Sequence, residues 1–190
     1  EKAKDVVWVD TASRNTKTYK EFIEESGMEV ALLRTEKDTI EALVDKMRSN
    51  LDFFELIHAK GNIFEMPNIM TYSSAHCESH SLTQWKGKAD IVHKDYVIDL
   101  KTTSNLDDFK WNARKYNYDS QAFIYQKLFG KPMMFLVIEK KTGRMGMFTG
   151  NQDFYDRGQD KMHRAIDVYH KFFSEESTID IQNYYVKEEI

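Results

Sequence analysis

The stretch KADIVHKDYVIDLKTT, residues 88–103, decides the fold of this chain. Two apolar runs within it, Ile91-Val92 and Tyr96-Val97-Ile98, are separated by the polar triplet His93-Lys94-Asp95. Short runs of β-branched and aromatic residues on either side of a polar turn are typical of a β-hairpin. The sequence therefore predicts two adjacent antiparallel strands in this region.

Three charged side chains are expected to converge at one end of this hairpin. Alternate residues of a strand share a face, so Asp99 and Lys101 project from the same side, and an antiparallel partner brings Asp90 beside them. Two carboxylates and an ammonium group suit a hard cation and an activated water. We therefore predict metal-dependent cleavage of a phosphodiester. The alternative is that this D-x-K triplet is a solvated strand face with a weak ion pair.

Two further polar side chains follow on a predicted helix. Gln121 and Tyr125 are four residues apart and so share one helical face. Lys101 is expected to orient and activate the attacking water and to offset negative charge in the transition state. Gln121 is then a candidate for positioning the water or the scissile phosphate, with Tyr125 supporting it. The alternative is a helix partly buried against the sheet, with Tyr125 in the core.

This ordered set of residues resembles the motifs of a known superfamily. Asp90, Asp99-Leu100-Lys101 and Gln121-x-x-x-Tyr125 are similar to the signature of the PD-(D/E)xK nucleases in their RecB-like branch. A longer run matches too, comprising residues 99–103, Phe109-Lys110, Tyr116, Tyr118, Gln121, Phe123 and Tyr125. That run is most similar to the RecE (exonuclease VIII) group of phage and prophage exonucleases. The likeness is good over residues 85–140 and weaker over residues 5–60.

The sequence departs from that family in two places. Ala89 stands where the pattern usually has Pro, which matters little because the acid that follows carries the chemistry. A helix with a His motif, which the family carries upstream of this region, is not found in the sequence. The expectations are that this helix precedes Glu1 or that another segment supplies this wall of the site.

The resemblance implies a restriction-endonuclease-like core and a Mg²⁺-dependent exodeoxyribonuclease, with Mn²⁺ as the alternative ion. It implies digestion of linear double-stranded DNA from its ends, 5′ to 3′, in phage-type recombination. A ring-shaped homo-oligomer and a strand-annealing protein partner are implied by the family alone. Two alternatives stay open: an endonuclease of the same superfamily, and a catalytically silent nuclease fold that binds DNA or a protein.

The expected metal ligands are the carboxylates of Asp90 and Asp99 and the backbone carbonyl of Leu100. The resemblance places a further carboxylate in the strand before the hairpin, where Glu78 is our choice. Glu65 is the runner-up, because the Met-Pro dipeptide beside it predicts a loop. The identity of this third acid stays open.

The residues after the catalytic strand are expected to contact DNA phosphates, through the side chains of Thr102, Thr103, Lys110, Arg114 and Lys115. Residues 101–144 hold nine Lys and Arg against four acids, a local charge of +5 in a chain whose net charge is −4. The overall charge argues against a protein that coats DNA nonspecifically, whereas the local excess favours phosphate binding near the site. The alternative is an ordinary solvated helix face rich in lysine.

Composition indicates one soluble globular domain, residues 1–190, with 31% charged and 41% hydrophobic residues. No run approaches the length of a membrane span, so no membrane partner is expected. Cys77 is the only cysteine, which excludes an internal disulfide and suits the reducing cytoplasm of a bacterial or phage-infected cell. One cysteine also cannot hold the iron–sulfur cluster of a Cas4-like nuclease.

The remaining patterns alternate between helical and strand periods. Predicted helices cover about residues 18–25, 35–57 with a kink near 50, 106–115, 120–129 and 151–173. Predicted strands cover about residues 5–10, 29–34, 74–85, 86–93, 96–103, 133–139 and 144–149. Thr35 is the expected N-cap of the second helix, and Asn151 that of the last. Core-facing helical positions are expected at Ile40, Leu43, Val44, Met47, Phe154, Met162, Ile166, Tyr169 and Phe173. This order predicts an α/β (α+β) domain with a central mixed β-sheet flanked by helices.

Overall fold

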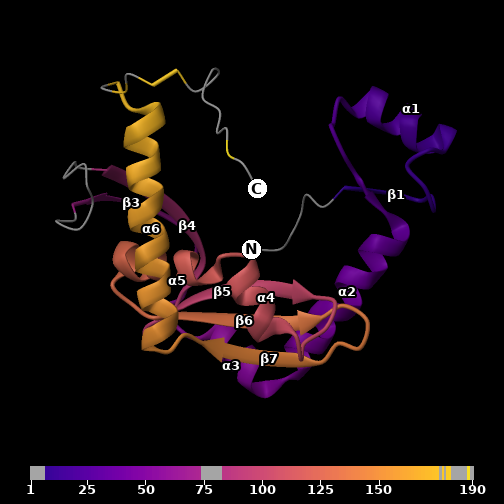
Figure 1. Ribbon diagram of the computed structural model, residues 1–190. Coiled ribbons are helices and arrows are strands. Elements are labelled where there is room, and N and C mark those ends of the chain that lie inside the picture. The colour runs from indigo at the N-terminus through magenta and orange to yellow at the C-terminus, as the bar shows by residue number, and fades with distance from the viewer. Residues whose placement is uncertain (1–6, 74–82, 176, 178, 181–187, 189–190) are drawn as a thin grey trace.

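A five-stranded mixed sheet forms the body of the protein (Figure 1). The computed structural model describes residues 7–73, 83–175, 177, 179–180 and 188. The strands lie in the order β3 (Ile63–Tyr72), β4 (Thr83–Val92), β5 (Val97–Thr103), β6 (Met133–Glu139) and β7 (Met145–Thr149). Only the β5–β6 pair is parallel. The predicted hairpin is therefore confirmed as β4–β5, with His93 N donating to Tyr96 O across its turn.

Helices cover both faces of this sheet (Figure 1). On one face lie α4 (Phe109–Lys115), α5 (Tyr118–Phe129) and α6 (Gln152–Phe173), packed on side chains of β6 such as Phe135. On the other face α3 (Leu51–His58) inserts Phe53 against Ile91, Ile98 and Leu136. Every residue of β6 is buried, as its apolar sequence predicts for a central strand. The predicted fold class is confirmed.

The N-terminal segment forms a small unit of its own, which α2 joins to the body (Figure 1). It consists of β1 (Trp8–Val9), α1 (Lys17–Ser26), the parallel partner β2 (Leu32–Leu33) and the start of α2 (Arg34–Ser49). Its core includes Tyr19, whose hydroxyl bonds both backbone groups of Ala31. The strands predicted over 5–10 and 29–34 are thus much shorter than expected.

The prediction for α2 was wrong in two respects. The N-cap is Leu33, one position before the helix, and Glu36 accepts a hydrogen bond from its backbone N–H; Thr35 lies inside the helix. No residue of α2 is buried, and Ile40 and Val44 are exposed. The core prediction holds at Met47, which packs beside Phe53, but Ile40 and Val44 lie on the part of α2 that spans from the N-terminal unit to the sheet (Figure 1).

Two other predictions need correction. The segment around Glu65 is not a loop, because it lies in β3, an edge strand in which an exposed Pro67 is tolerated. Most of the strand predicted over 74–85 lies outside the described residues. The cap at Asn151 is confirmed, since its side chain accepts from Phe154 N, but Tyr169 and Phe173 are exposed. At 22 residues, α6 extends beyond the sheet, so these two side chains lie past the layer that the sheet covers (Figure 1).

Within the described residues, no helix combines the length and the apolar character that crossing a bilayer requires.

Candidate active site at the fork between two strands

The site lies where β4 and β5 separate. These strands pair at Ile91–Ile98 and Val92–Val97, and the next register position belongs to Asp90 and Asp99. At this level the two strands are joined by a side-chain hydrogen bond in place of a backbone one. Asp90 Oδ2 accepts a 2.9 Å hydrogen bond from the backbone N–H of Leu100. The carboxylate of Asp90 is therefore held against β5, next to Asp99, as the hairpin argument predicts.

The alternation of β4 is interrupted at Asp90. Ala89 packs with Tyr125 of α5, whereas Ile91, two residues on, packs with Phe53 on the opposite face. In a regular strand, residues two apart share a face. The side chains of β4 therefore change faces at Asp90. As a result, its carboxylate lies in the fork, the gap where β4 and β5 separate.

The facing strand is irregular at the same level. Glu65 of β3 lies between the paired positions Phe64–Ile91 and Met66–Ala89, which places it across from Asp90. Its φ of 52° is in the left-handed region, which non-glycine residues adopt rarely. Its carboxylate forms an ion pair with Lys88. Glu65 is thus the acid that the structure brings nearest in register to Asp90, while Glu78 lies outside the described residues.

Asp99 is the most enclosed member of the site. Its residue is 6% exposed, and Gln121 Nε2 donates a 2.7 Å hydrogen bond to its Oδ1. Lys101 Nζ lies 2.7 Å from its Oδ2. Apart from this ion pair, the buried Oδ2 has no hydrogen-bond partner among the residues that the structure describes. The structure therefore brings Asp99, Lys101 and Gln121 together, with Gln121 at one carboxylate oxygen and Lys101 at the other.

Burial raises the pKa of the Asp99 carboxyl above its ordinary value, and the ammonium group of Lys101 opposes that rise. The charge of Asp90 acts in the same direction as burial. A further positive charge in the fork is therefore electrostatically favoured when both carboxyl groups are ionised.

The donor set fits a magnesium ion. Mg²⁺ is commonly held by one or two carboxylates together with several waters. Asp90 and Asp99 supply two carboxylates, and Oδ2 of Asp99, which is paired with Lys101 alone, keeps a lone pair for a further cation. Across the described part of the chain, no group of three or more His, Cys, Asp and Glu side chains is placed to hold a metal ion. The two carboxylates of Asp90 and Asp99 are therefore the acidic ligands that the described residues offer at the fork.

Tyr118 is a neighbour of the site to which the sequence argument gave no role, although it belongs to the run that carries the family resemblance. Lys101 Nζ lies 4.9 Å from the centre of its ring, and the ring stacks on Phe135 with centroids 5.6 Å apart. A ring in this place restricts the rotation of the lysine and favours its charged form. The available signal was spacing, since Tyr118 precedes Gln121 by three residues and so shares its helix face.

Tyr125 contacts the β4 backbone two residues before Asp90. Its hydroxyl donates a 3.0 Å hydrogen bond to the carbonyl of Lys88. The close approach needs Gly87, where a Cβ atom would lie 2.9 Å from Leu128 Cδ1 and 3.2 Å from Tyr125 Cε2. The structure therefore places Tyr125 as a clamp between α5 and the strand that carries Asp90.

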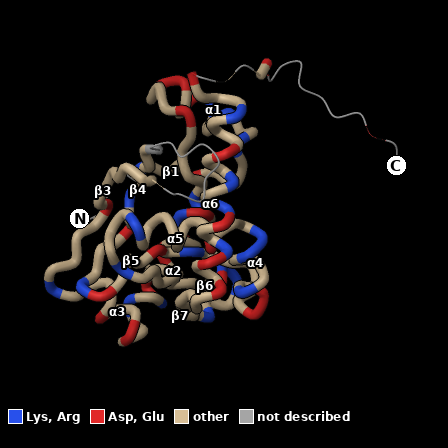
Figure 2. The backbone as a smooth tube through the Cα atoms, turned by 60° about the vertical axis from the view of Figure 1, so that its left-hand side comes forward, with Lys and Arg blue, Asp and Glu red and all other residues tan. Residues whose placement is uncertain are grey.

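The predicted DNA-binding residues divide into two groups. Lys110, Arg114 and Lys115 are exposed and give α4 a series of basic positions (Figure 2). Thr102 is exposed at the end of β5, whereas Thr103 is buried. The Thr103 hydroxyl donates to Asn105 O and accepts from Asn105 N, so its hydrogen bonds are used within the loop.

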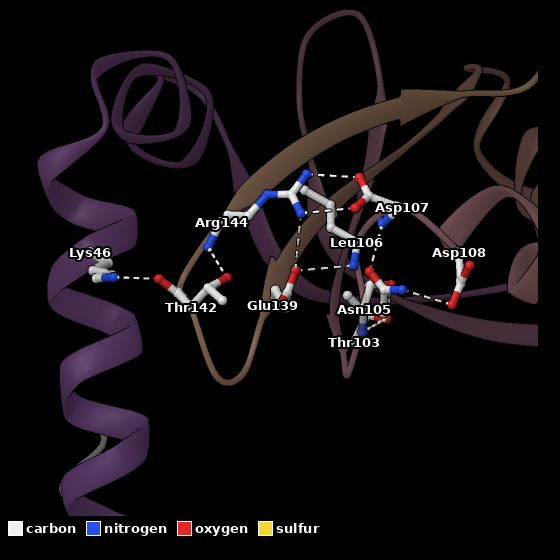
Figure 3. Close-up of polar contacts among 9 residues, drawn as sticks. All are labelled: Lys46, Thr103, Asn105, Leu106, Asp107, Asp108, Glu139, Thr142 and Arg144. Atoms are coloured by element: carbon white, nitrogen blue, oxygen red, sulfur yellow. Dashed lines mark hydrogen bonds and ion pairs between the residues drawn. The ribbon is translucent and has the colours of Figure 1, made fainter.

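The loop that follows the catalytic strand is fastened to the β6–β7 hairpin (Figure 3). Arg144 donates two hydrogen bonds to Asp107, of 3.0 and 2.8 Å, and lies 3.7 Å from the buried Glu139. Glu139 Oε2 also accepts from Leu106 N at 3.2 Å. These contacts fix the path of the chain from Lys101 to α4.

Comparison with solved structures shows one with a similar fold, and a second match of lower similarity. A "putative exonuclease" from Eubacterium rectale superimposes with a TM-score of 0.57 and 17% identity, over 91% of this chain and 71% of that one. A structure of SSO0001 matches with a TM-score of 0.39 and 16% identity, over 64% of this chain and 55% of the other. No curated protein matches the chain.

A family model matches residues 8–180, which include the N-terminal unit, the sheet and α6. Its description is PDDEXK-like domain of unknown function (DUF3799). The match confirms the superfamily to which the sequence was assigned by resemblance. The chain belongs to this family of PDDEXK-like domains.

Proposed function

We propose that this domain is a metal-dependent exodeoxyribonuclease that hydrolyses linear double-stranded DNA from its ends, with 5′ to 3′ polarity. The observation that supports hydrolysis is the set of groups around Asp99. Lys101 lies at one of its carboxylate oxygens, Gln121 at the other, and Asp90 is beside it. The preference for ends, the polarity and a role in phage-type recombination rest on the resemblance of residues 99–125 to RecE-like exonucleases.

The ligands of the proposed Mg²⁺ or Mn²⁺ are Asp90, Asp99 and the carbonyl of Leu100. The ion supplies a bound water of lowered pKa and stabilises negative charge on the phosphoryl oxygens. The surroundings of Asp99 Oδ2 support this assignment, since this buried oxygen is paired with Lys101 and has no other hydrogen-bond partner among the described residues, which leaves it a lone pair for a metal ion. Glu65 and Glu78 remain the candidates for a third acid.

Lys101 positions the attacking water relative to the scissile phosphate. Its ammonium group has three donors and no acceptor, so one can remain toward Asp99 while the others contact a water and a phosphate oxygen. The ring of Tyr118 on one side and Asp99 on the other limit the conformations of the side chain. Gln121 keeps the Asp99 carboxylate in a fixed orientation, and Tyr125 keeps α5 on β4.

The duplex is proposed to lie along α4. The positive charges of Lys110, Arg114 and Lys115 face solvent there, and Thr102 at the end of β5 adds a hydroxyl close to Lys101. Exposed Trp111 presents an aromatic face on the same helix. A strand-annealing partner and a ring of several copies are proposals that rest on the family resemblance.

The test is digestion of end-labelled linear duplex DNA beside a covalently closed circle, with Mg²⁺ or Mn²⁺. Wild type, Lys101→Ala and the control Lys141→Ala, an exposed lysine in the β6–β7 turn, are compared. Loss of the linear DNA alone, absent in Lys101→Ala and unchanged in Lys141→Ala, is expected, and 5′ and 3′ labels give the polarity.

Two other results would replace this proposal. Cutting of the circle by wild type assigns an endonuclease. Failure to cut either DNA, together with no Mg²⁺-dependent rise in the unfolding temperature, assigns a silent nuclease fold. The unfolding measurement separates loss of metal binding from loss of the chemical step.

A further inference from the structure

A hollow of about 300 Å³ lies between α4, the end of β7 and the start of α6. This volume is at the lower end of the range of roughly 300–1,000 Å³ found for small-molecule sites. Its floor is aromatic, formed by Phe109 and Phe135, which are buried, and by Phe148 and Phe154, which are partly accessible. The rings of Phe109 and Phe148 lie 4.6 Å apart. Such a floor suits a flat, apolar group.

The rim of this hollow is cationic. Lys110, Arg114 and Arg157 line it, and no lining residue is acidic. Lys110 and Arg114 are four residues apart on α4 and therefore share a face. Neither forms an ion pair with any residue that the structure describes. Two positive charges at the rim are thus available to an anion.

Arg157 supplies a donor that lacks an acceptor. Its Nε is buried and makes no hydrogen bond within the described part of the chain. The nearest carboxylate oxygen, Asp119 Oδ2, is 3.8 Å away and already accepts a 2.8 Å hydrogen bond from Lys161. The guanidinium carbon lies 5.9 Å from the centre of the Phe154 ring. The Arg157 side chain is 37% exposed and lines the hollow, so its guanidinium group adds a third positive charge there while the buried Nε lies toward Asp119.

The start of α6 adds to the positive potential. Asn151 caps this helix and lines the hollow together with Thr149 and Gly150. The N–H of Phe154 is taken by the Asn151 side chain and Asp153 is acidic, so the contribution of this helix start is limited to its remaining first-turn N–H groups, which lack intrahelical acceptors. Three basic side chains, the start of a helix and an aromatic floor thus occur in one cavity.

We propose that this hollow binds a nucleoside monophosphate. The phosphate contacts Lys110, Arg114 and Arg157, and the base lies on the rings of Phe148 and Phe154. The ligand has two sources, the terminal nucleotide of a DNA strand or a free mononucleotide. The first source deepens the proposed nuclease function and rests on it, whereas the second does not depend on catalysis.

The hollow borders the catalytic fork. Phe135 pairs in register with Asp99 on the neighbouring strand. The ring of Phe135 also stacks on Tyr118, which lies over Lys101. A nucleotide in the hollow would therefore lie on the same face of the sheet as the reacting groups, with one aromatic layer between them.

The test is isothermal titration with dAMP in EDTA, so that it does not depend on metal or on hydrolysis. Saturable binding to wild type is expected, weaker by roughly tenfold in Arg114→Ala and in Lys110→Ala, since each removes a charge-assisted hydrogen bond. Ala113→Leu, which fills the hollow without a change of charge, is expected to abolish binding. Lys141→Ala and Lys101→Ala are expected to bind as wild type does.

Competition identifies the source of the ligand. A phosphorylated oligonucleotide that displaces dAMP, where its unphosphorylated counterpart does not, assigns a strand terminus; displacement by free mononucleotides alone assigns a free ligand. The proposal is overturned if dAMP does not bind, or if inorganic phosphate binds as tightly as dAMP. It is also overturned if Lys101→Ala abolishes binding while the hollow variants keep it, because the nucleotide then occupies the catalytic fork. The binding and competition measurements do not depend on nuclease activity, so they can be made even if the protein does not cleave DNA.

Discussion

Gln121 donates a 2.7 Å hydrogen bond from Nε2 to Oδ1 of Asp99. A side chain of α5 therefore fixes the orientation of a carboxylate on the adjacent strand β5. The bond occupies one oxygen and directs the other, Oδ2, toward Lys101. Outer residues that orient a metal-ligating carboxylate determine both its affinity and its geometry. Gln121 is therefore better described as a positioning residue of the proposed metal site than as a group that contacts the phosphate.

Gln121→Met removes this donor while keeping the length of the side chain. We expect the Mg²⁺ concentration for half-maximal activity to rise, and the maximal rate to fall, by about 10- to 100-fold in total. The measurement is a Mg²⁺ titration of nuclease rate on linear DNA, with Gln126→Met on the same helix as the control. An unchanged Mg²⁺ requirement would show that Asp99 is oriented without Gln121.

Asp99→Asn is expected to stabilise the metal-free protein at neutral pH. Burial raises the folded-state pKa of Asp99, so the folded state binds more protons than the unfolded state between the two pKa values. The contribution of Asp99 to stability is therefore full below the unfolded pKa and is lost as pH rises through the folded pKa. Asn stays neutral and has no such loss.

The measurement for Asp99→Asn is thermal unfolding in EDTA from acid to neutral pH, compared with wild type. The difference in unfolding temperature should grow with pH in favour of the variant. Adding Mg²⁺ should raise the unfolding temperature of wild type only, and nuclease activity should be absent from the variant. A variant that is less stable at neutral pH, with the same pH dependence as wild type, would contradict the role given to burial.

Arg144→Met is expected to loosen the loop that joins the catalytic strand to α4 (Figure 3). It removes both bonds to Asp107 and leaves Glu139 buried without its cation. The KM for DNA should rise several-fold with kcat little changed, since Lys101 stays in place while α4 shifts. Steady-state kinetics test this, with Lys94→Met at the exposed β4–β5 turn as the control. A fall in kcat alone would place Arg144 in the chemistry instead.

Arg144 also holds the pKa of Asp107 below its ordinary value, chiefly through their hydrogen bonds. The stability from this pair is therefore present above the unfolded pKa of about 3.9 and is lost as pH falls through the folded pKa. The stability difference between wild type and Arg144→Met should accordingly shrink in acid. A difference that persists at the lowest pH would assign it to Glu139 packing.

Much of the fold could be predicted because its signals are local. The apolar run of β6 is all buried, and the hairpin has a polar turn between two strand-like runs. The spacing of Asp90, Asp99 and Lys101 also predicted that these side chains lie close together, because a hairpin brings its flanking residues side by side. Local pattern and tertiary structure agree in these elements.

The errors occurred where tertiary structure decides. Pro67 argued against a strand because proline has no N–H to donate. However, β3 is an edge strand, and the N–H groups on its outer side have no neighbouring strand to bond. The apolar positions of α2 indicated a core along the whole helix, but Met47 packs on the core whereas Ile40 and Val44 are exposed. Tyr118 and the bond from Leu100 N to Asp90 depend on how α5 and the fork are placed, which no short sequence window reports.

Gly158→Ala provides a test of the packing that holds α5 over the site. A Cβ atom at Gly158 would lie 2.1 Å from the carbonyl oxygen of Asp119 and 2.7 Å from its carbonyl carbon, so backbone would have to move. Helix propensity alone predicts that alanine stabilises by roughly 0.5–1 kcal/mol. We expect the opposite sign, a loss of about 1–3 kcal/mol or more, because overpacking against backbone cannot be relieved by a rotamer change. Urea unfolding measures the sign directly, with Ala165→Ser at an exposed position of α6 expected within about 0.5 kcal/mol of wild type. A stabilised Gly158→Ala would mean that α5 and α6 are not in contact at this crossing.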